Sequence, residues 1–212
     1  IISGLVPCNE IADGFLSDHP ERSRAMFIES GNPVHSLAES EKFRQAMRAA
    51  DCTVVIDVAM TETAEQADWV LPASSQYEKA EATFFSAAFP ENMFHLRPAI
   101  LEPLEGTLSE PEIHSRLVQA TGVLDDIDFD ALRAAAEEGL QSFSEAFMNA
   151  ALENKAVSEY GAVVLYETLG KTLPWEKQGG AVLWFSCQMV AQKYPEQVRS
   201  AGHTGEGAEL GN

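Results

Sequence analysis

Two short, continuously apolar runs lie near the start of the chain, at 25–28 and 53–56, and a third follows at 69–72. Runs of large or β-branched apolar residues are typical of parallel strands that are buried on both faces. Between the first two runs, one apolar stripe recurs with helical spacing: Leu37, Phe43, Ala46, Met47 and Ala50. Strand, helix and strand within so few residues predict a right-handed βαβ crossover with parallel strands.

The start of this helix is marked by Ser36 and Glu39, which have the spacing of a capping box. In a capping box each side chain satisfies a backbone N–H that the first helical turn leaves unpaired. The loops that follow the strands are therefore expected to share one edge of the sheet.

The second half of the chain has a mainly helical pattern. Ser109 and Glu112 form a second capping-box pair, and Asp128 is the expected cap of a long helix in which Gly139 is a tolerated weak point. Further helices are predicted at 156–169, ended by Gly170, and at 181–193. The last of these is apolar on more than one face, which favours a core helix of a bundle, with a docking face as the alternative.

These patterns predict an α/β fold with a Rossmann-like parallel sheet and flanking helices, followed by a mainly helical C-terminal segment. The expected domains are an α/β part at 1–108, a helical segment at 109–200 and a tail or linker at 201–212. The last segment is rich in glycine and has no periodic pattern of apolar residues.

Candidate chemistry follows the first strand. Gly31 allows a tight turn and Pro33 fixes the direction of the chain, while Asn32 and His35 offer polar groups at the start of a helix, where partial positive charge favours phosphate. An Asn-Pro turn is also ordinary loop chemistry, so the local pattern leaves a purely structural role open.

The second strand ends at Asp57, whose carboxylate can accept hydrogen bonds from a guanine edge or a ribose. Thr61, an expected N-cap, offers its hydroxyl to the same ligand. The structural alternative for Asp57 is a turn or cap residue.

Composition narrows the functional classes. The chain has 33 acidic and 14 basic residues and a net charge of −19, which opposes binding to nucleic acid or anionic membranes and favours partners with basic faces. Its three cysteines are far apart, which is typical of a reducing compartment, and no apolar run approaches the roughly 20 residues that cross a bilayer. We expect a cytoplasmic location, with export left open because the chain begins inside apparent domain sequence.

Several common sites are not encoded. The sequence has no CxxC pair for an iron–sulfur cluster or zinc, and no GxGxxG, P-loop or GxSxG motif.

An ordered set of short motifs resembles the molybdopterin oxidoreductases of the dimethyl sulfoxide reductase and formate dehydrogenase superfamily. The motifs are Glu29-Ser30-Gly31-Asn32-Pro33, Val55-Ile56-Asp57 with Thr61-Glu62-Thr63-Ala64, Ala67-Asp68-Trp69-Val70-Leu71-Pro72, and Glu78-Lys79. The resemblance extends from the first residue to about Gly122.

This resemblance implies an internal part of an oxidoreductase catalytic subunit that holds a molybdopterin guanine dinucleotide. Gly31, Asn32, Pro33 and His35 would lie at the dinucleotide, Asp57 would bind the guanine, and Thr61 would lie beside it. Molybdenum and a 4Fe–4S cluster would be held elsewhere in the full enzyme, so this part alone would be inactive. The implied partners are the remaining domains of the enzyme and an electron-transfer subunit.

The chain departs from the family after Glu78-Lys79. Ala82 and Ser86 stand where the family often has glycine and asparagine, which puts a pterin contact from this loop in doubt. Arg97 is interpreted as a surface arginine, with an anion partner as the alternative. Two other functions remain open: a non-catalytic α/β protein-interaction module, and a binder of free mononucleotides.

Overall fold

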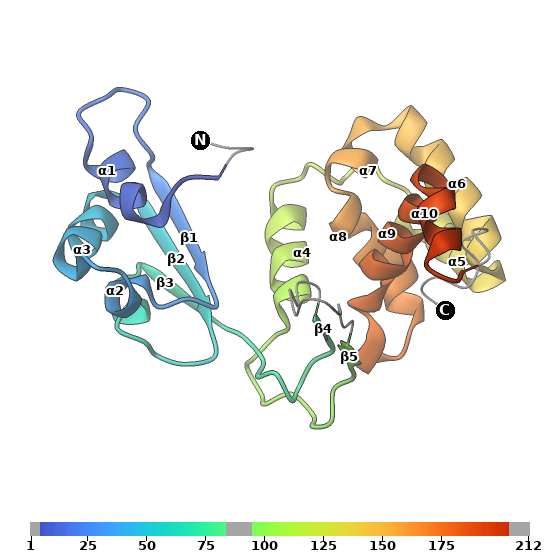
Figure 1. Cartoon of the computed structure of the whole chain (residues 1–212), viewed down its shortest axis with the longest axis horizontal. Helices are drawn as coiled ribbons and strands as arrows, with labels where there is room; N and C mark the ends of the chain where they lie inside the picture. The colour runs from blue at the N-terminus through green and yellow to red at the C-terminus, as the bar shows by residue number, and fades with distance from the viewer. Residues whose placement is uncertain (1–4, 84–94, 204–212) are drawn as a thin grey trace. The chain divides into compact units, whose positions relative to one another are not determined.

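The structure is a computed structural model that describes residues 5–83 and 95–203 (Figure 1). It divides into two compact units, one of residues 1–75 and 104–110, the other of residues 76–103 and 111–212. The elements of the first unit are η1 (Cys8–Glu10), α1 (Ile11–Leu16), β1 (Ala25–Glu29), α2 (Pro33–Ser36), α3 (Ser40–Ala49), β2 (Cys52–Asp57), η2 (Ala64–Gln66) and β3 (Trp69–Pro72).

The first unit is built on a three-stranded parallel sheet with the order β1-β2-β3. Phe27, Val54 and Trp69 lie opposite one another in the register of the three strands. Beyond β3, Ala73 forms a parallel bridge to Leu108, so the returning segment lies beside the end of that strand. The predicted βαβ arrangement of parallel strands is confirmed.

The core of this unit lies between the sheet and its helices, which Figure 1 shows on the same side of the sheet. The α3 residues Phe43, Ala46 and Met47 are buried there together with Met26 and Val55 of the sheet. Leu37 and Ala50 pack against this cluster. The apolar stripe predicted from the sequence therefore covers the sheet as expected.

The other face of the sheet is less covered, which corrects the prediction of burial on both faces. Only β2 is buried at consecutive positions, whereas β1 alternates and leaves Phe27 59% exposed. Trp69 of β3 is 66% exposed. The physical reason is that the helices of this unit all pack on one face, and the outer strands have a single sheet neighbour each.

The predicted capping box of Ser36 and Glu39 is wrong. Ser36 ends the one-turn helix α2, where its hydroxyl donates to Asn32 O at 2.9 Å, and α3 begins only at Ser40. Pro33 starts α2 after the turn that follows β1, and the extended conformation of Leu37 separates the two helices.

The second unit is mainly helical. Its strands β4 (Glu81–Thr83) and β5 (His95–Arg97) pair antiparallel. The other elements are α4 (Glu110–Ala120, whose first residue belongs to the first unit), α5 (Phe129–Glu138), α6 (Leu140–Glu153), α7 (Lys155–Glu159), α8 (Gly161–Leu165), the π-helical turn η3 (Tyr166–Gly170), η4 (Trp175–Lys177), α9 (Gly180–Lys193) and α10 (Pro195–Ser200).

Aromatic side chains form much of the core of this unit. Phe143 and Phe147 of α6 are buried, and the ring of Phe143 lies 6.1 Å from that of Trp184 in α9. Phe185 of α9 lies 5.0 Å from Phe147. The interpretation of residues 181–193 as a core helix is confirmed for the face that carries Trp184, whereas Met189 and Val190 on the same helix are 44% and 47% exposed.

Two predicted long helices are interrupted. The first begins as expected, with Asp128 Oδ1 accepting the N–H of Ala131 at 2.9 Å, but it breaks at Gly139, which has φ +141° and separates α5 from α6. A conformation of that kind is accessible to glycine and strained for other residues. The second is interrupted at Tyr160 and continues as the π-helical turn η3 to Gly170. Lys171 and Thr172 are still helical, so Gly170 does not end the helix as predicted.

In the described residues, no helix combines the length and the apolar character that crossing a membrane requires. The predicted tail at 201–212 lies mostly outside the described residues, as does Ser86.

Candidate functional site

The loops that follow β1 and β2 meet at the carboxyl ends of these parallel strands. Ser30 donates its N–H to the carbonyl of Ile56 at 3.0 Å, so a hydrogen bond joins the ends of β1 and β2 where the two loops begin. We call residues 30–35 and 57–63 the strand-end site. In open α/β sheets, ligands bind beyond this edge of the strands.

Asn32 joins the two loops through its side chain. Its Oδ1 accepts hydrogen bonds from the N–H of Thr63 at 3.2 Å and from the Thr63 hydroxyl at 2.7 Å. Its Nδ2 donates to Glu62 Oε2 at 2.6 Å. The amide that the sequence marked as a ligand contact is therefore largely used within the protein.

Thr63 is a residue of this site that the sequence interpretation did not single out. Its side chain is 0% exposed, and its hydroxyl accepts the N–H of Val34 at 3.1 Å. The available signal was its position within the Thr61-Glu62-Thr63-Ala64 motif, but a motif does not reveal which of two threonines points inward.

The N–H groups of α2 are engaged by the protein. Pro33 has no N–H, Val34 donates to Thr63, and His35 and the residue after it donate to Asn32 O. The predicted attraction of phosphate by this helix start therefore has no free donor within the helical turn itself.

The backbone just before α2 offers other donors. Among the residues that the structure describes, the N–H groups of Gly31 and Asn32 have no acceptor. The left-handed conformation lies at Ser30, with φ +51°, and a Cβ placed on Gly31 would make only ordinary contacts, the nearest at 3.7 Å. The turn is therefore formed by Ser30, and Gly31 leaves room beside it.

Asp57 ends β2 with one carboxylate oxygen engaged and one open. Its Oδ1 accepts the N–H groups of Val58 at 2.7 Å and Ala59 at 3.2 Å. Oδ2 has no hydrogen bond within the part of the chain that the structure describes. The turn interpretation and the ligand interpretation of Asp57 are thus compatible, because each uses a different oxygen.

Thr61 does not occupy the predicted N-cap position, which is Thr63 in η2, but its side chain still contacts the start of that helix. Its hydroxyl oxygen accepts the N–H of Ala64 at 3.2 Å, which leaves the hydroxyl proton free to be donated.

The exposed part of the site carries a carboxylate and an imidazole. His35 Nδ1 lies 3.5 Å from Glu62 Oε1, and the two side chains are 73% and 51% exposed. The pKa of Glu62 is lowered, chiefly by the hydrogen bond from Asn32, then by backbone hydrogen bonding and by the neighbouring His35. Glu62 is therefore an anion at neutral pH.

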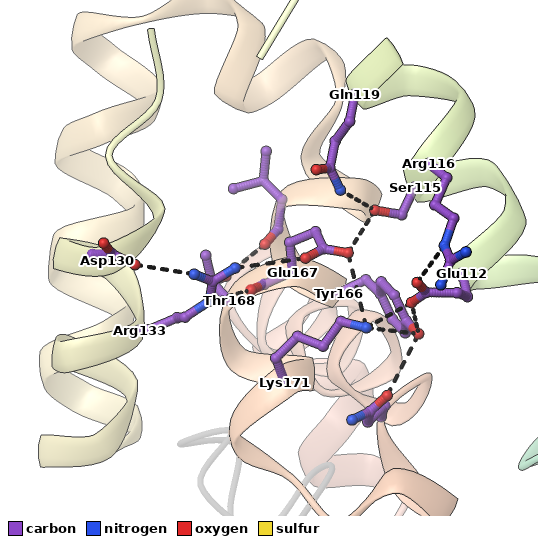
Figure 2. Close-up of polar contacts among 12 residues, drawn as sticks. Glu112, Ser115, Arg116, Gln119, Asp130, Arg133, Tyr166, Glu167, Thr168 and Lys171 are labelled. Carbon is purple, nitrogen blue, oxygen red and sulfur yellow. Dashed lines mark hydrogen bonds and ion pairs between the residues drawn. The ribbon is translucent and has the colours of Figure 1, made fainter. Parts of the chain in front are cut away.

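A second polar network lies in the helical unit, and Figure 2 shows its connections. We call it the buried polar cluster; its members are Glu112, Ser115, Arg133, Tyr166, Glu167 and Lys171. Ser115, Tyr166 and Glu167 are buried, whereas the side chains of Glu112, Lys171 and Arg133 are 19%, 28% and 37% exposed. Lys171 Nζ donates to Glu112 Oε2 at 2.6 Å and to the Tyr166 hydroxyl at 3.3 Å, and that hydroxyl donates to Glu112 Oε2 at 2.9 Å.

The other half of this cluster surrounds Glu167. The Ser115 hydroxyl donates to Glu167 Oε1 at 2.6 Å, and Arg133 Nε donates to the Glu167 carbonyl at 2.8 Å. The Arg133 guanidinium also lies 3.6 Å from Glu167 Oε2. The cluster therefore fixes α4 and α5 to the π-helical turn η3.

Electrostatics within the buried polar cluster favour its charged form. Burial would raise the pKa of Glu112, but hydrogen bonds from Lys171, Arg116 and Tyr166 outweigh it and lower the pKa to about 2. The pKa of Lys171 is raised, since the hydrogen bond to Glu112 outweighs the opposing effect of burial. Glu112 is thus an ion-pair partner, and the predicted capping-box role for its side chain is wrong. With charges and donors matched inside the protein, this cluster is a structural feature.

Arg97 is partly covered and paired with Glu81 across the β4–β5 ladder. Its guanidinium carbon lies 6.0 Å from the centre of the Tyr77 ring, and its buried Nε has no partner among the described residues. The surface-arginine interpretation is therefore only partly right, because the side chain is 30% exposed.

Metal ligands are not gathered anywhere in the described ranges 5–83 and 95–203, where no three His, Cys, Asp or Glu residues form a suitable group. The cysteines Cys8, Cys52 and Cys187 are free thiols.

Comparisons with known proteins point to one family. Residues 4–102 match the family described as molybdopterin oxidoreductase. The chain is 34% identical over 103 residues to the probable oxidoreductase YoaE of Bacillus subtilis (strain 168), a match covering 48% of this chain and 15% of the relative. It is 31% identical over 97 residues to the probable oxidoreductase YyaE of the same organism, covering 46% and 14%. The matched region thus spans about one seventh of these relatives.

Proposed function

We propose, on the premise that residues 4–102 belong to the molybdopterin oxidoreductase family, that the strand-end site binds the guanosine end of a molybdopterin guanine dinucleotide. The family implies a molybdopterin cofactor, and the dinucleotide form is our proposal. The chain would then serve as the cofactor-binding part of a longer oxidoreductase.

The observation that carries this proposal is the open oxygen of Asp57. Guanine presents two neighbouring N–H donors on one edge, and a carboxylate at the end of a central parallel strand can accept them. The hydrogen bonds from Val58 and Ala59 hold the carboxylate in one orientation before a ligand arrives. Such preorganisation reduces the cost of binding.

The remaining groups of the site suit a sugar and a diphosphate. The Thr61 hydroxyl lies on the same loop as Asp57, and the N–H groups of Gly31 and Asn32 are the donors for phosphate oxygen. His35 adds an exposed imidazole beside Glu62. These residues include each one that the sequence assigned to the cofactor.

A bound molybdopterin supplies the metal centre for two-electron oxidation or reduction. The residues of the strand-end site would bind and orient the cofactor. We propose that other parts of the full protein hold molybdenum and any iron–sulfur cluster.

The partners that we propose are the remaining domains of that longer protein and an electron-transfer subunit. The exposed apolar side chains of Phe27 and Trp69, which lie on either side of Val54 on the sheet, offer a surface for such a domain.

Calorimetric titration of the chain with GDP and ADP tests the proposed function. GDP carries the guanosine diphosphate portion of the dinucleotide, so we expect saturable binding that favours GDP. Asp57→Asn is the sharpest variant, because its Oδ1 can still accept the loop N–H groups while a donor replaces Oδ2. We expect this change to weaken GDP binding by about 30-fold, equivalent to about 2 kcal/mol, with ADP binding unaffected.

Two results would contradict the proposed function. Equal affinities for GDP and ADP would indicate a binder of free mononucleotides, and no binding by a folded sample would favour a protein-interaction module. Circular dichroism of Asp57→Asn provides the folding control.

A further inference from the structure

Thr63 connects both sides of the strand-end site through one side chain and one amide. Its hydroxyl donates to Asn32 Oδ1 at 2.7 Å and accepts the N–H of Val34 at 3.1 Å, while its own N–H donates to Asn32 Oδ1 at 3.2 Å. The three hydrogen bonds link the loop after β2 to the residues before and inside α2.

Burial separates this residue from any ligand. The Thr63 side chain is 0% exposed, so it has no surface with which to touch a molecule bound from solvent. Its hydroxyl uses both its proton and an acceptor position within the protein. In a buried environment such hydrogen bonds are strengthened and hold their groups in place.

The neighbours of Thr63 are the groups that the proposed ligand would meet. Glu62 and Thr61 precede it on the loop that starts at Asp57, and Asn32 carries one of the unengaged N–H groups. The Asn32 amide oxygen already accepts two hydrogen bonds, which matches the usual capacity of a carbonyl oxygen.

We propose that Thr63 is a positioning residue which, together with the side chain of Asn32, sets the spacing between the Asp57 loop and the turn at Gly31. This inference rests on the proposed function, because the ligand concerned is the guanosine end of the cofactor. It assigns the side chain of Asn32 to the protein and leaves its backbone N–H for the ligand.

Three variants separate positioning from general stability. Thr63→Val keeps the shape of the side chain and removes the hydroxyl, and Thr63→Ser keeps the hydroxyl. Thr53→Val is the matched control at the opposite end of β2: Thr53 is 1% exposed, donates to Asp68 Oδ2 at 2.8 Å and accepts the Asp68 N–H at 2.9 Å. The control therefore removes an equally buried hydroxyl far along the strand.

The measurement is GDP affinity at a temperature where all variants are folded. We expect Thr63→Val to bind GDP about tenfold more weakly, since misplaced groups lose preorganised contacts. Thr63→Ser should recover to within about twofold of the wild type, and Thr53→Val should match the wild type. Equal affinities for Thr63→Val and Thr53→Val would overturn the inference.

A second measurement needs no ligand. Hydrogen exchange of the Val34 amide should be faster in Thr63→Val than in the wild type and return to normal in Thr63→Ser. Unchanged exchange would overturn the inference even if GDP did not bind. If GDP does not bind but the Val34 amide exchanges faster in Thr63→Val, only the proposed function is contradicted. The positioning of the loops by Thr63 would then stand.

Discussion

The strand-end site and the buried polar cluster are both dense hydrogen-bonded networks. They differ in whether all of their polar groups have partners within the protein. In the cluster, Lys171 meets Glu112 and Tyr166, and Glu167 meets Ser115, so the strong donors and acceptors find one another inside the protein. In the strand-end site, buried bonds hold the loops while Asp57 Oδ2 stays open. A high density of hydrogen bonds therefore does not identify a binding site. A better indication is a donor or acceptor that has no partner in the protein but is held in place by buried hydrogen bonds.

The largest expected effect comes from breaking the buried polar cluster at Lys171. Lys171→Met leaves the Glu112 and Glu167 carboxylates without the ammonium at 2.6 and 4.0 Å. We expect the free energy of unfolding to fall by about 3 kcal/mol, because removal of one partner leaves a poorly compensated charge that is largely withdrawn from solvent. Urea denaturation measures this change, and GDP affinity should not change in the folded protein.

The control for this variant is Lys155→Met. Lys155 is exposed and forms an ion pair with Glu159 on the helix surface. An exposed pair of this kind contributes little, so no measurable change in denaturation is expected. Similar losses for both lysine variants would contradict the structural role of the cluster.

A pair of glycine substitutions sharpens the same comparison. A Cβ on Gly170, in η3, would lie 2.8 Å from the backbone oxygen of Gln178, whereas a Cβ on Gly31 would make ordinary contacts. We expect Gly170→Ala to cost about 2 kcal/mol of stability through overpacking and Gly31→Ala to cost less than about 0.5 kcal/mol. Thermal unfolding of the two variants measures the difference. Weaker GDP binding by a fully stable Gly31→Ala would show that the ligand approaches this backbone.

Acid should weaken the buried polar cluster through Glu112. The pKa of Glu112 is about 2 in the folded protein and near 4.5 as the ordinary value. Because the folded pKa is the lower one, its contribution to stability is complete above pH 4.5 and is lost as the pH falls toward 2. After allowance for solvent screening we expect a loss of about 1–2 kcal/mol. Urea denaturation at pH 5, 4 and 3 measures this loss, and Glu112→Gln should flatten that part of the profile.

The smallest expected effect concerns Glu62. Glu62→Gln keeps an oxygen that can accept from Asn32 Nδ2 and removes a negative charge near the proposed diphosphate. We expect GDP to bind about twofold more tightly at low salt, with the difference vanishing at high salt because exposed charges are screened. Titrations at two salt concentrations test this, and a loss of affinity would indicate that the carboxylate itself contacts the ligand.

The predictions from sequence succeeded where short-range patterns decide structure. The apolar runs at 25–28 and 53–56 form parallel strands, and the stripe around Phe43 covers the sheet. Two predictions of helix boundaries were wrong because a local feature overrode the periodic pattern. At Ser36 the capping pattern was overridden by Pro33, which starts a separate turn, and at Gly139 a backbone angle of +141° interrupts the expected helix.

The sequence by itself determined the parallel strands β1 to β3, the apolar stripe that α3 buries and the motifs of the Asp57 and Asn32 loops, because these depend on periodicity and on residues close along the chain. Only the tertiary structure decided which polar groups meet. Asn32 and Thr63 are 31 positions apart, and Glu112 and Lys171 are 59 apart. A hydrogen bond depends on distance and direction between two side chains, and sequence periodicity specifies neither across such separations.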